Sequence, residues 1–235
     1  MSIITIVGAG VMGSAMCWPA RDNGHEVRLV GTHLDREIID AAQKTGEHIK
    51  LKRRLPDGVR CHQIEDLETA LEGAELVIGG VSSFGAKWFE NTVLPKIPDG
   101  VPVLSVTKGL EEQPDGTLLP FPTAMAGRLP EGRRLSLNAI GGPCLCYELC
   151  HRYDTTIAFC GPDRALLEHL RDMLETEHYH VCISTDVAGV ECAVAMKNGF
   201  ALGVALAIGQ KLEAGINNLN PESALFGEAT RETLR

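Results

Sequence analysis

The sequence predicts an α/β fold, in which a doubly wound and mostly parallel sheet is followed by the start of an all-helical C-terminal domain. Three observations support this prediction. Short runs typical of strands alternate with helical stretches, a glycine-rich turn follows the first run, and a long apolar stretch follows the last one. Strands that alternate with helices form parallel βαβ units, with helices covering both faces of the sheet.

The individual elements follow from these patterns. Strands are predicted at residues 3–7, 27–30, 59–62, 76–80, 103–106, 135–140, 156–160 and 180–184. Helices are predicted at residues 14–23, 67–71, 86–94 and 164–176. The first helix contains Pro19, which should kink it, and Gly24 provides a stop signal just beyond its end.

The pattern changes after Ser184. Thr185 or Asp186 can cap a new helix, and residues 187–212 are apolar on almost all sides, with small residues throughout. A helix of this kind is buried on most sides, so it should lie between two bodies or inside a second helical domain. We therefore predict a sheet domain at residues 1–185 and a helical substrate domain at residues 186–235.

Composition and charge exclude several classes of protein. The 235-residue chain carries a net charge of −9, which opposes binding to nucleic acids and anionic membranes. We expect no nucleic-acid partner and no membrane insertion, because the uncharged run at residues 199–210 is shorter than the roughly 20 residues that span a bilayer. The eight cysteines do not resemble a secreted disulfide framework, so a cytoplasmic location is expected.

The first predicted strand leads into a glycine loop at residues 8–13, and a helix leaves this loop. This context is the fingerprint of a dinucleotide site in a Rossmann-type fold. Gly8 would make the tight turn, Gly10 would let the backbone approach a pyrophosphate, and Gly13 would let helix and strand pack closely. A glycine turn without a ligand is the alternative.

The second predicted strand indicates which dinucleotide is bound. It ends at Gly31, where such folds usually place an acidic residue on the ribose 2′-hydroxyl. The missing carboxylate removes repulsion against a 2′-phosphate, and Thr32 and His33 are candidate donors to it. The sequence therefore favours NADP as the cofactor, with NAD as the alternative.

Two lysines are candidates for chemistry. Lys108 follows a strand, so it should point into the ligand crevice of the sheet, although a solvated surface lysine is the alternative. Lys197 lies inside the apolar helix, where an ammonium group is costly without a partner or water. Burial would lower its pKa and suit it to proton transfer, while snorkelling at the helix edge is the alternative. Glu191 lies six residues earlier and does not share a face with Lys197.

A second glycine segment, residues 141–146, also follows a strand. It could close over a ligand with backbone amides, or form a plain turn. Cys144, Cys146 and Cys150 precede His151, but this spacing matches no common zinc pattern. No metal is therefore expected, because free cysteines usually behave as small hydrophobic residues.

These segments together resemble the NAD(P)-dependent glycerol-3-phosphate dehydrogenase family, from the first strand through Asn198. Residues 8–13 are similar to the family's glycine loop, and residues 107–109 to its T-K-G segment. Residues 141–146 are similar to its S-G-P-S/T-x-A segment, and residues 195–198 to its A-x-K-N segment. Four motifs in the right order and spacing make the resemblance specific.

The resemblance implies an oxidoreductase that interconverts sn-glycerol 3-phosphate and dihydroxyacetone phosphate by hydride transfer. Lys197 would be the general acid/base, and Lys108 would orient the substrate and polarise the same oxygen. The implied substrate-binding residues are Lys108, Gly142, Cys144, Lys197, Asn198 and Asn220. The implied cofactor-binding residues are Gly8, Gly10, Val11, Met12, Gly13, Thr32, His33, Phe84, Lys108 and Cys146.

The chain also departs from the family pattern. Gly141 replaces the serine of the S-G-P segment, and Glu228 falls where an arginine should bind the substrate phosphate. Arg231 or Arg235 would substitute for that arginine if the helix shifted by a turn. Two alternatives therefore stay open: a related dehydrogenase of an unphosphorylated hydroxy acid or polyol, or a catalytically incomplete dinucleotide-binding protein.

The stretch after Lys197 is shorter than the family's helical domain. A truncated gene product and a genuinely shorter variant are both compatible with this length. In either case the apolar helix would be incompletely covered, and a homodimer is expected to supply the missing cover.

Overall fold

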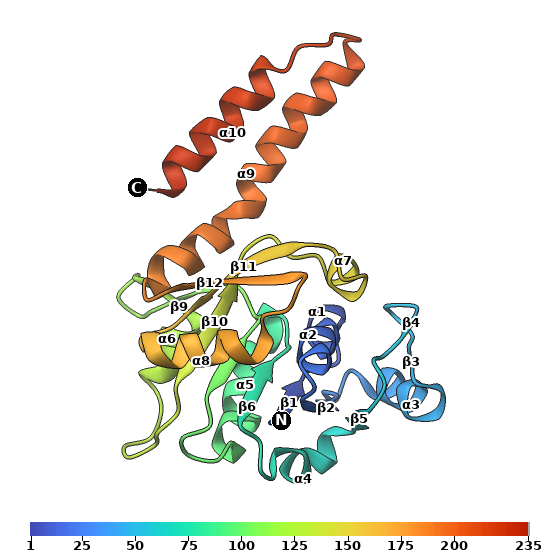
Figure 1. Cartoon of the computed structure of the whole chain (residues 1–235). Coiled ribbons are helices and arrows are strands. Elements are labelled where there is room, and N and C mark those ends of the chain that lie inside the picture. The colour runs from blue at the N-terminus through green and yellow to red at the C-terminus, as the bar shows by residue number, and fades with distance from the viewer. Residues whose placement is uncertain (235) are drawn as a thin grey trace.

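The computed structural model of the chain describes residues 1–234, which form an eight-stranded sheet flanked by helices and a projecting helical hairpin (Figure 1). The strand order is β12-β11-β10-β7-β6-β1-β2-β5. Neighbouring strands are parallel except for β10 and β11, which are antiparallel. The strands of this sheet are β1 (Ile3–Val7), β2 (Glu26–Val30), β5 (Val59–His62), β6 (Leu76–Gly79), β7 (Val103–Ser105), β10 (Leu137–Gly141), β11 (Thr155–Cys160) and β12 (Tyr179–Ser184).

These strands are the eight that the sequence predicts, with ends that shift by no more than two residues. Strand β1 lies between β2 and β6, and the chain crosses over β1 on its way from β5 to β6. The loops after β1 and β6 therefore leave the sheet in opposite directions. In open α/β sheets this point is where ligands bind.

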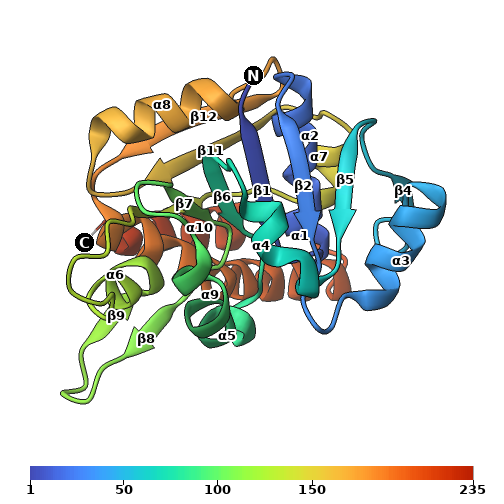
Figure 2. The ribbon, with the colours of Figure 1, turned by 90° about the horizontal axis from the view of Figure 1, so that it is seen from below.

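Helices cover both faces of the sheet (Figure 2). Two separate buried clusters hold them there, because side chains alternate between the faces along each strand. Thus Ile6 packs toward one layer and Val7 toward the other. The first layer holds α1 (Val11–Ala15), α2 (Cys17–Asp22), α3 (Arg36–Thr45), α7 (Cys146–Cys150) and α8 (Arg164–Leu174). The second holds α4 (Leu67–Leu71), α5 (Ala86–Thr92) and α6 (Phe121–Ala126).

The first predicted helix is divided into α1 and α2 at Met16. Pro19 has no amide hydrogen to donate to the carbonyl of Ala15, and its ring crowds that carbonyl. The helix therefore breaks at Met16, about one turn before Pro19, which is the residue expected to cause the break. Asn23 and Gly24 end the second segment, with Gly24 at φ 76°.

Several short elements lie outside the predicted pattern. Two small antiparallel hairpins are formed by β3 (Glu47–His48) with β4 (Arg53–Arg54), and by β8 (Leu110–Glu112) with β9 (Leu118–Pro120). Single turns of 3₁₀ helix occur at η1 (Ile64–Asp66), η2 (Ser83–Gly85) and η3 (Leu94–Lys96). These pieces are too short for a hydrophobic period to reveal them.

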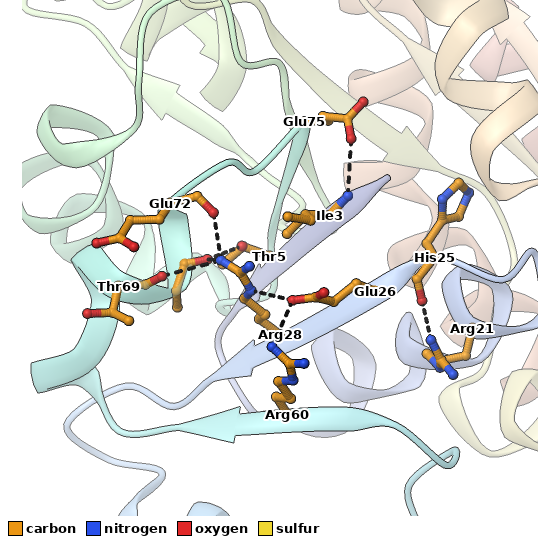
Figure 3. A network of polar contacts seen from close by, with 11 residues as sticks. Ile3, Thr5, Arg21, His25, Glu26, Arg28, Arg60, Thr69, Glu72 and Glu75 are labelled. Atoms are coloured by element: carbon orange, nitrogen blue, oxygen red, sulfur yellow. Dashed lines mark hydrogen bonds and ion pairs between the residues drawn. The ribbon is translucent and has the colours of Figure 1, made fainter. Parts of the chain in front are cut away.

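A polar network around Arg28 fastens the end of α4 to the sheet (Figure 3). Arg28 of β2 donates to the side chain of Glu26 at 2.9 Å and to the backbone oxygen of Glu72 at 2.7 Å. It also donates to the backbone oxygens of Thr69 and Ala70. One planar guanidinium group thereby satisfies several carbonyls at the end of a short helix.

The last two helices form a hairpin that projects from the sheet (Figure 1). Helix α9 (Val187–Glu213) begins at the predicted cap, where the Asp186 carboxylate accepts from the Gly189 amide at 2.8 Å. Helix α10 (Asn220–Thr233) returns beside it, and Lys211 pairs with Glu222 across the hairpin at 3.0 Å.

The surface of α9 differs from the expectation. Only Glu191 and Val194 are buried among its residues, so the prediction of a helix buried on most sides is wrong for this chain alone. The helix is also long and apolar enough to cross a membrane by length and composition, with a mean hydropathy of 1.6 over its most apolar window. The uncharged run at residues 199–210, on which the expectation of no membrane insertion rests, is part of this longer helix. The helix also contains Glu191 and Lys197, and charged side chains are costly inside the hydrocarbon core of a membrane.

Three glycines bring β1, β6 and α1 into backbone contact. A Cβ added to Gly13 would lie 2.2 Å from the Gly8 oxygen and 2.9 Å from the Gly80 Cα. A Cβ added to Gly80 would lie 2.7 Å from the same Gly8 oxygen. Gly8 itself has φ 114°, which other residues rarely adopt. No side chain therefore fits at any of these positions.

We expect the Gly13→Ala variant to lose about 3 kcal/mol of unfolding free energy, because the new methyl group meets backbone atoms that cannot move aside. Gly203→Ala is the matched control, since Gly203 lies in α9 with open space around it. That substitution should stabilise by about 0.5–1 kcal/mol through helix propensity. Urea denaturation measures both, and equal stability of the two variants would contradict the packing role of Gly13.

Candidate functional site

A cavity of about 340 Å³ opens at the carboxyl ends of β1, β2 and β6. It lies at the point where the strand order reverses, as the sequence predicts for the glycine loop. Of the residues predicted to bind a cofactor, the ones that line it are Gly8, Gly10, Thr32, His33 and Phe84. Its other lining residues are Leu34, Asp35, Lys50, Gly80, Val81, Ser82, Gly85 and Trp88.

Other predicted cofactor residues lie elsewhere in the structure. Val11, Met12 and Cys146 are half-buried and pack against the core. Gly13 is buried in the glycine contact between α1 and β6. The structure thus brings together the glycine turn, the end of β2 and the loop after β6 around the cavity. These four residues lie outside the cavity lining.

Two buried side chains hold the peptide groups of Ala9 at the centre of the glycine loop. The Ala9 amide donates to the Asp35 carboxylate at 3.2 Å. The Ala9 oxygen lies 3.0 Å from Nε2 of His48, whose Nδ1 accepts from the Leu51 amide at 3.1 Å. That pattern fixes the His48 proton on Nε2. Burial lowers the pKa of His48, so the ring stays neutral and keeps this tautomer.

The carboxylate of Asp35 also determines what Thr32 can do. Asp35 accepts from the Thr32 amide at 2.9 Å and from the Thr32 hydroxyl at 2.8 Å. The hydroxyl hydrogen is therefore directed at Asp35, and the predicted donation from Thr32 to a 2′-phosphate does not match this arrangement. Asp35 is the acidic residue beyond β2, and its hydrogen bonds join the glycine loop to the loop after β2.

Lys50 is a cavity residue that the sequence reasoning missed. It is exposed, lies beyond α3, and lines the same cavity as Trp88. Trp88 packs against His33, with ring centroids 5.8 Å apart. The signal in the sequence was a basic run at residues 50–54. Its relation to the loop after β2 depends on α3, which was not predicted.

A second group of residues gathers where β7 ends. Lys108 is half-buried, and its pKa is lowered first by burial and then by the nearby Lys197 ammonium group. Cys144 and Glu191 act in the opposite direction. The Thr107 hydroxyl donates to the Val81 oxygen at 2.7 Å, which fastens this segment to the cavity wall. The two predicted catalytic lysines, distant in sequence, therefore lie close enough to repel each other.

The segment after β10 brings α9 toward the sheet. A Cβ added to Gly141 would lie 2.5 Å from Cγ1 of Val190 in α9. Gly142 has φ 121° and lies against the backbone of Ile157. Gly141 thus lets the helix that carries Lys197 pack directly on the end of the sheet.

The remaining predicted substrate residues are divided between two places. Asn198 is exposed on α9, next to Lys197. Asn220 begins α10 at the outer end of the hairpin, near the Lys211–Glu222 pair. Since a helix rises 1.5 Å per residue, Asn220 lies roughly 20 Å along α9 from Lys197. The structure does not bring Asn220 to the lysines.

On α10, the structure shows how Glu228 and Arg231 are arranged at the position where the family has an arginine. Glu228 accepts from Arg231 at 3.0 Å, and both side chains are exposed. Arg231 is therefore directed at Glu228 in this arrangement. Arg235 lies outside the described residues.

The cysteines of the second glycine segment are thiols in apolar surroundings. Burial raises the pKa of Cys144 to about 11 and that of Cys150 to about 12. Among residues 1–234, no three His, Cys, Asp or Glu side chains gather in an arrangement that could hold a metal ion.

Comparisons with known proteins agree on one family. The family model described as NAD-dependent glycerol-3-phosphate dehydrogenase N-terminus matches residues 3–166. An NADP(+)-dependent glycerol-3-phosphate dehydrogenase of Archaeoglobus fulgidus is 35% identical over 230 residues, which cover 98% of this chain and 68% of the relative. A glycerol-3-phosphate dehydrogenase (NAD(P)+) of Bacillus velezensis is 31% identical, covering 89% of this chain and 59% of the relative.

Solved structures agree on the fold. A glycerol-3-phosphate dehydrogenase from Coxiella burnetii superposes with a TM-score of 0.83 at 24% identity, covering 100% of this chain and 68% of that one. The enzyme from Plasmodium falciparum gives a TM-score of 0.82 at 19% identity, covering 99% of this chain and 64% of that one. The predicted Rossmann-type sheet with a helical C-terminal part is confirmed.

The raised pKa of Cys144 predicts slow alkylation at neutral pH despite its place beside Lys108. With a pKa of about 11, roughly one thousandth of the thiol is ionised at pH 8, and only the thiolate reacts. Iodoacetamide labelling followed by mass spectrometry should find Cys144 modified far more slowly than the exposed Cys182. The rate should rise about tenfold per pH unit up to pH 11. Rapid labelling at pH 7 would show that the lysines activate the thiol.

Proposed function

Because this chain belongs to the family of NAD-dependent glycerol-3-phosphate dehydrogenases, we propose that it interconverts sn-glycerol 3-phosphate and dihydroxyacetone phosphate with NAD(P). The observation that carries the proposal is the nearness of Lys197 to Lys108, in a segment that Thr107 fastens to the wall of the glycine-loop cavity. The chain spans 68% of its archaeal relative and 59% of its Bacillus relative.

The cavity fits a dinucleotide. Gly8, Gly13 and Gly80 keep side chains out of the turn, and only the Gly80 oxygen approaches the Cβ position of Gly10, at 3.9 Å. Backbone amides at the start of α1 would hold the pyrophosphate. Phe84, 99% exposed at the cavity edge, offers an apolar ring for the nicotinamide end. When bound, the dinucleotide supplies or accepts the hydride.

The chain's own contribution is charge and proton transfer. Two ammonium groups close together create a local positive field on a chain whose net charge is −9. Such a field binds an anionic substrate and stabilises negative charge on the reacting oxygen. In the proposed roles Lys108 orients and polarises the C2 oxygen, while Lys197 donates the proton to it or removes it. Gly142, Cys144 and Asn198 would complete the substrate pocket.

For the cofactor we favour NADP over NAD. The archaeal relative is named as NADP(+)-dependent. Lys50 and His33 stand at the rim of the cavity near the end of β2, where the adenosine ribose would lie. Oδ2 of Asp35 accepts from Ala9 and Thr32, so this oxygen is not available to a ribose hydroxyl as it would be in an NAD-selecting acid.

An unphosphorylated hydroxy acid or polyol is the second candidate substrate. The pairing of Arg231 with Glu228 favours it, since that arginine is directed at a carboxylate. Oxidation of NADPH by dihydroxyacetone phosphate, compared with a panel of ketoacids, decides between the two. A protein that binds NADPH but reduces neither class would be a binding module.

We propose a cytoplasmic homodimer that is not inserted in a membrane. The support is the exposed apolar surface of the hairpin, which a second copy could cover. Its large exposed side chains include Leu202, Leu206, Leu212 and Phe226. The proposed division remains a dinucleotide-binding domain at residues 1–185 and a substrate domain from residue 186.

Replacing Lys197 with methionine should lower kcat for dihydroxyacetone phosphate by roughly 10²–10⁴-fold, because positioned proton transfer contributes about that factor. NADPH affinity should stay the same. Lys44→Met, at the exposed end of α3, is the control and should keep full activity. Retention of more than a tenth of the activity in the Lys197 variant would remove this lysine from proton transfer.

Replacing Lys50 with glutamine should raise the Kd of NADPH about tenfold, which is the loss of one charge-assisted contact to a phosphate. The Kd of NADH should hardly change, because NADH lacks the 2′-phosphate. Lys52→Gln removes the same charge two residues away, outside the cavity lining, and should affect neither cofactor. Fluorescence titration measures all four constants, and equal weakening of both cofactors would refute selective phosphate binding.

A further inference from the structure

Glu191, in the second turn of α9, has a feature that the proposed mechanism leaves unused. Its side chain is completely buried, and neither carboxylate oxygen accepts a hydrogen bond from any of residues 1–234. Buried carboxylates are normally hydrogen-bonded or paired, and an ionised one costs several kcal/mol to remove from water. A leucine at this position would avoid that cost, so the presence of a carboxylate here suggests a function for its charge.

The surroundings of Glu191 supply one. Burial raises the pKa of its carboxyl group to about 7, while Lys108 and the backbone of Gly109 oppose the rise. The Gly109 amide is near enough to do this, although it does not meet hydrogen-bond geometry. In return, Glu191 opposes the fall in the pKa of Lys108. The two groups therefore lie near each other, without a direct ion pair, where α9 approaches the segment after β7.

Lys108 lies between charges of both signs on α9. Lys197 lies six residues beyond Glu191, on a different side of the helix, and both act on Lys108. The other titratable groups nearby are thiols: Cys144 faces Lys108, and Cys160 faces Glu191. Lys108 is half-buried and Lys197 is exposed, and the repulsion between their ammonium groups favours loss of a proton from Lys108. The Glu191 carboxylate opposes part of this repulsion.

We propose that Glu191 is a positioning residue that keeps Lys108 protonated and directed at the substrate oxygen, so that Lys197 alone exchanges the proton. This inference rests on the proposed function, because Lys108 matters only if a substrate oxygen lies beside it. Glu191 does not touch the substrate and acts only through Lys108.

The sign of the effect follows from the two titrations. Above pH 7 Glu191 is mostly ionised and favours the charged form of Lys108. Glutamine has nearly the same shape but no charge, so Glu191→Gln leaves the Lys108 ammonium group facing Lys197 without compensation. The pKa of Lys108 should therefore fall by about one unit, the lower end of the range for a neighbouring opposite charge.

The primary test measures Lys108 without any substrate. An amine-acylating reagent is applied to the full chain from pH 6 to 11, and the modification of Lys108 is followed by mass spectrometry. The midpoint in Glu191→Gln should shift downward by about one pH unit relative to wild type. Glu213→Gln, the same change at the exposed end of α9, should leave it in place. Equal midpoints in the two variants, both folded by circular dichroism, would overturn the inference.

Kinetics give the second readout. Glu191→Gln should lower kcat at least tenfold with a smaller change in KM, and the alkaline limb of its pH profile should move down with Lys108. Glu191→Asp keeps the charge and should restore part of kcat. A shifted labelling midpoint in a protein that does not reduce dihydroxyacetone phosphate would overturn the proposed function. Reduction of that substrate with an unshifted midpoint would overturn the role of Glu191 alone.

Discussion

The contact of Gly8, Gly13 and Gly80 is the constraint on which the rest of the site depends. It brings two strands and a helix start to backbone distance, closer than any side chain would allow. This proximity forms the turn after β1, opens the cavity beside it and leaves Ala9 within reach of Asp35 and His48. A buried carboxylate and a neutral imidazole then hold the two peptide groups on either side of Ala9, so the turn is fixed before a ligand arrives.

Charge is used differently in the two halves of the site. Around the glycine turn, Oδ2 of Asp35 accepts three hydrogen bonds within the protein, and it stabilises structure. Around the lysines the balance is incomplete, because Glu191 lacks hydrogen bonds and Lys108 faces Lys197. Groups whose charge is poorly compensated have shifted pKa values, and such groups are typical of reaction centres. In the proposed function, the first half would bind the cofactor and the second would carry the reaction.

Most of the sheet could be predicted from the sequence, because strands such as β1 and β6 are continuous apolar runs, and a strand buried on both faces requires them. Helix α3 was missed because its sequence is mostly polar, with only Ile38, Ile39 and Ala42 buried. The lysine motifs placed Lys108 and Lys197 together. The roles of Asp35, Lys50 and Glu191 could not be predicted, because each depends on a contact between segments far apart in sequence.

Gly141 also sets a distance. The family segment carries a serine at this position, and a side chain here would overlap Val190. With hydrogen in place of that side chain, α9 rests directly against β10, and the glycine fixes how far the helix stands from the sheet. Because Lys108 lies just after β7 of the sheet and Lys197 lies on the helix, that separation contributes to the gap between their ammonium groups. Gly141 therefore acts as a spacer between the two lysines.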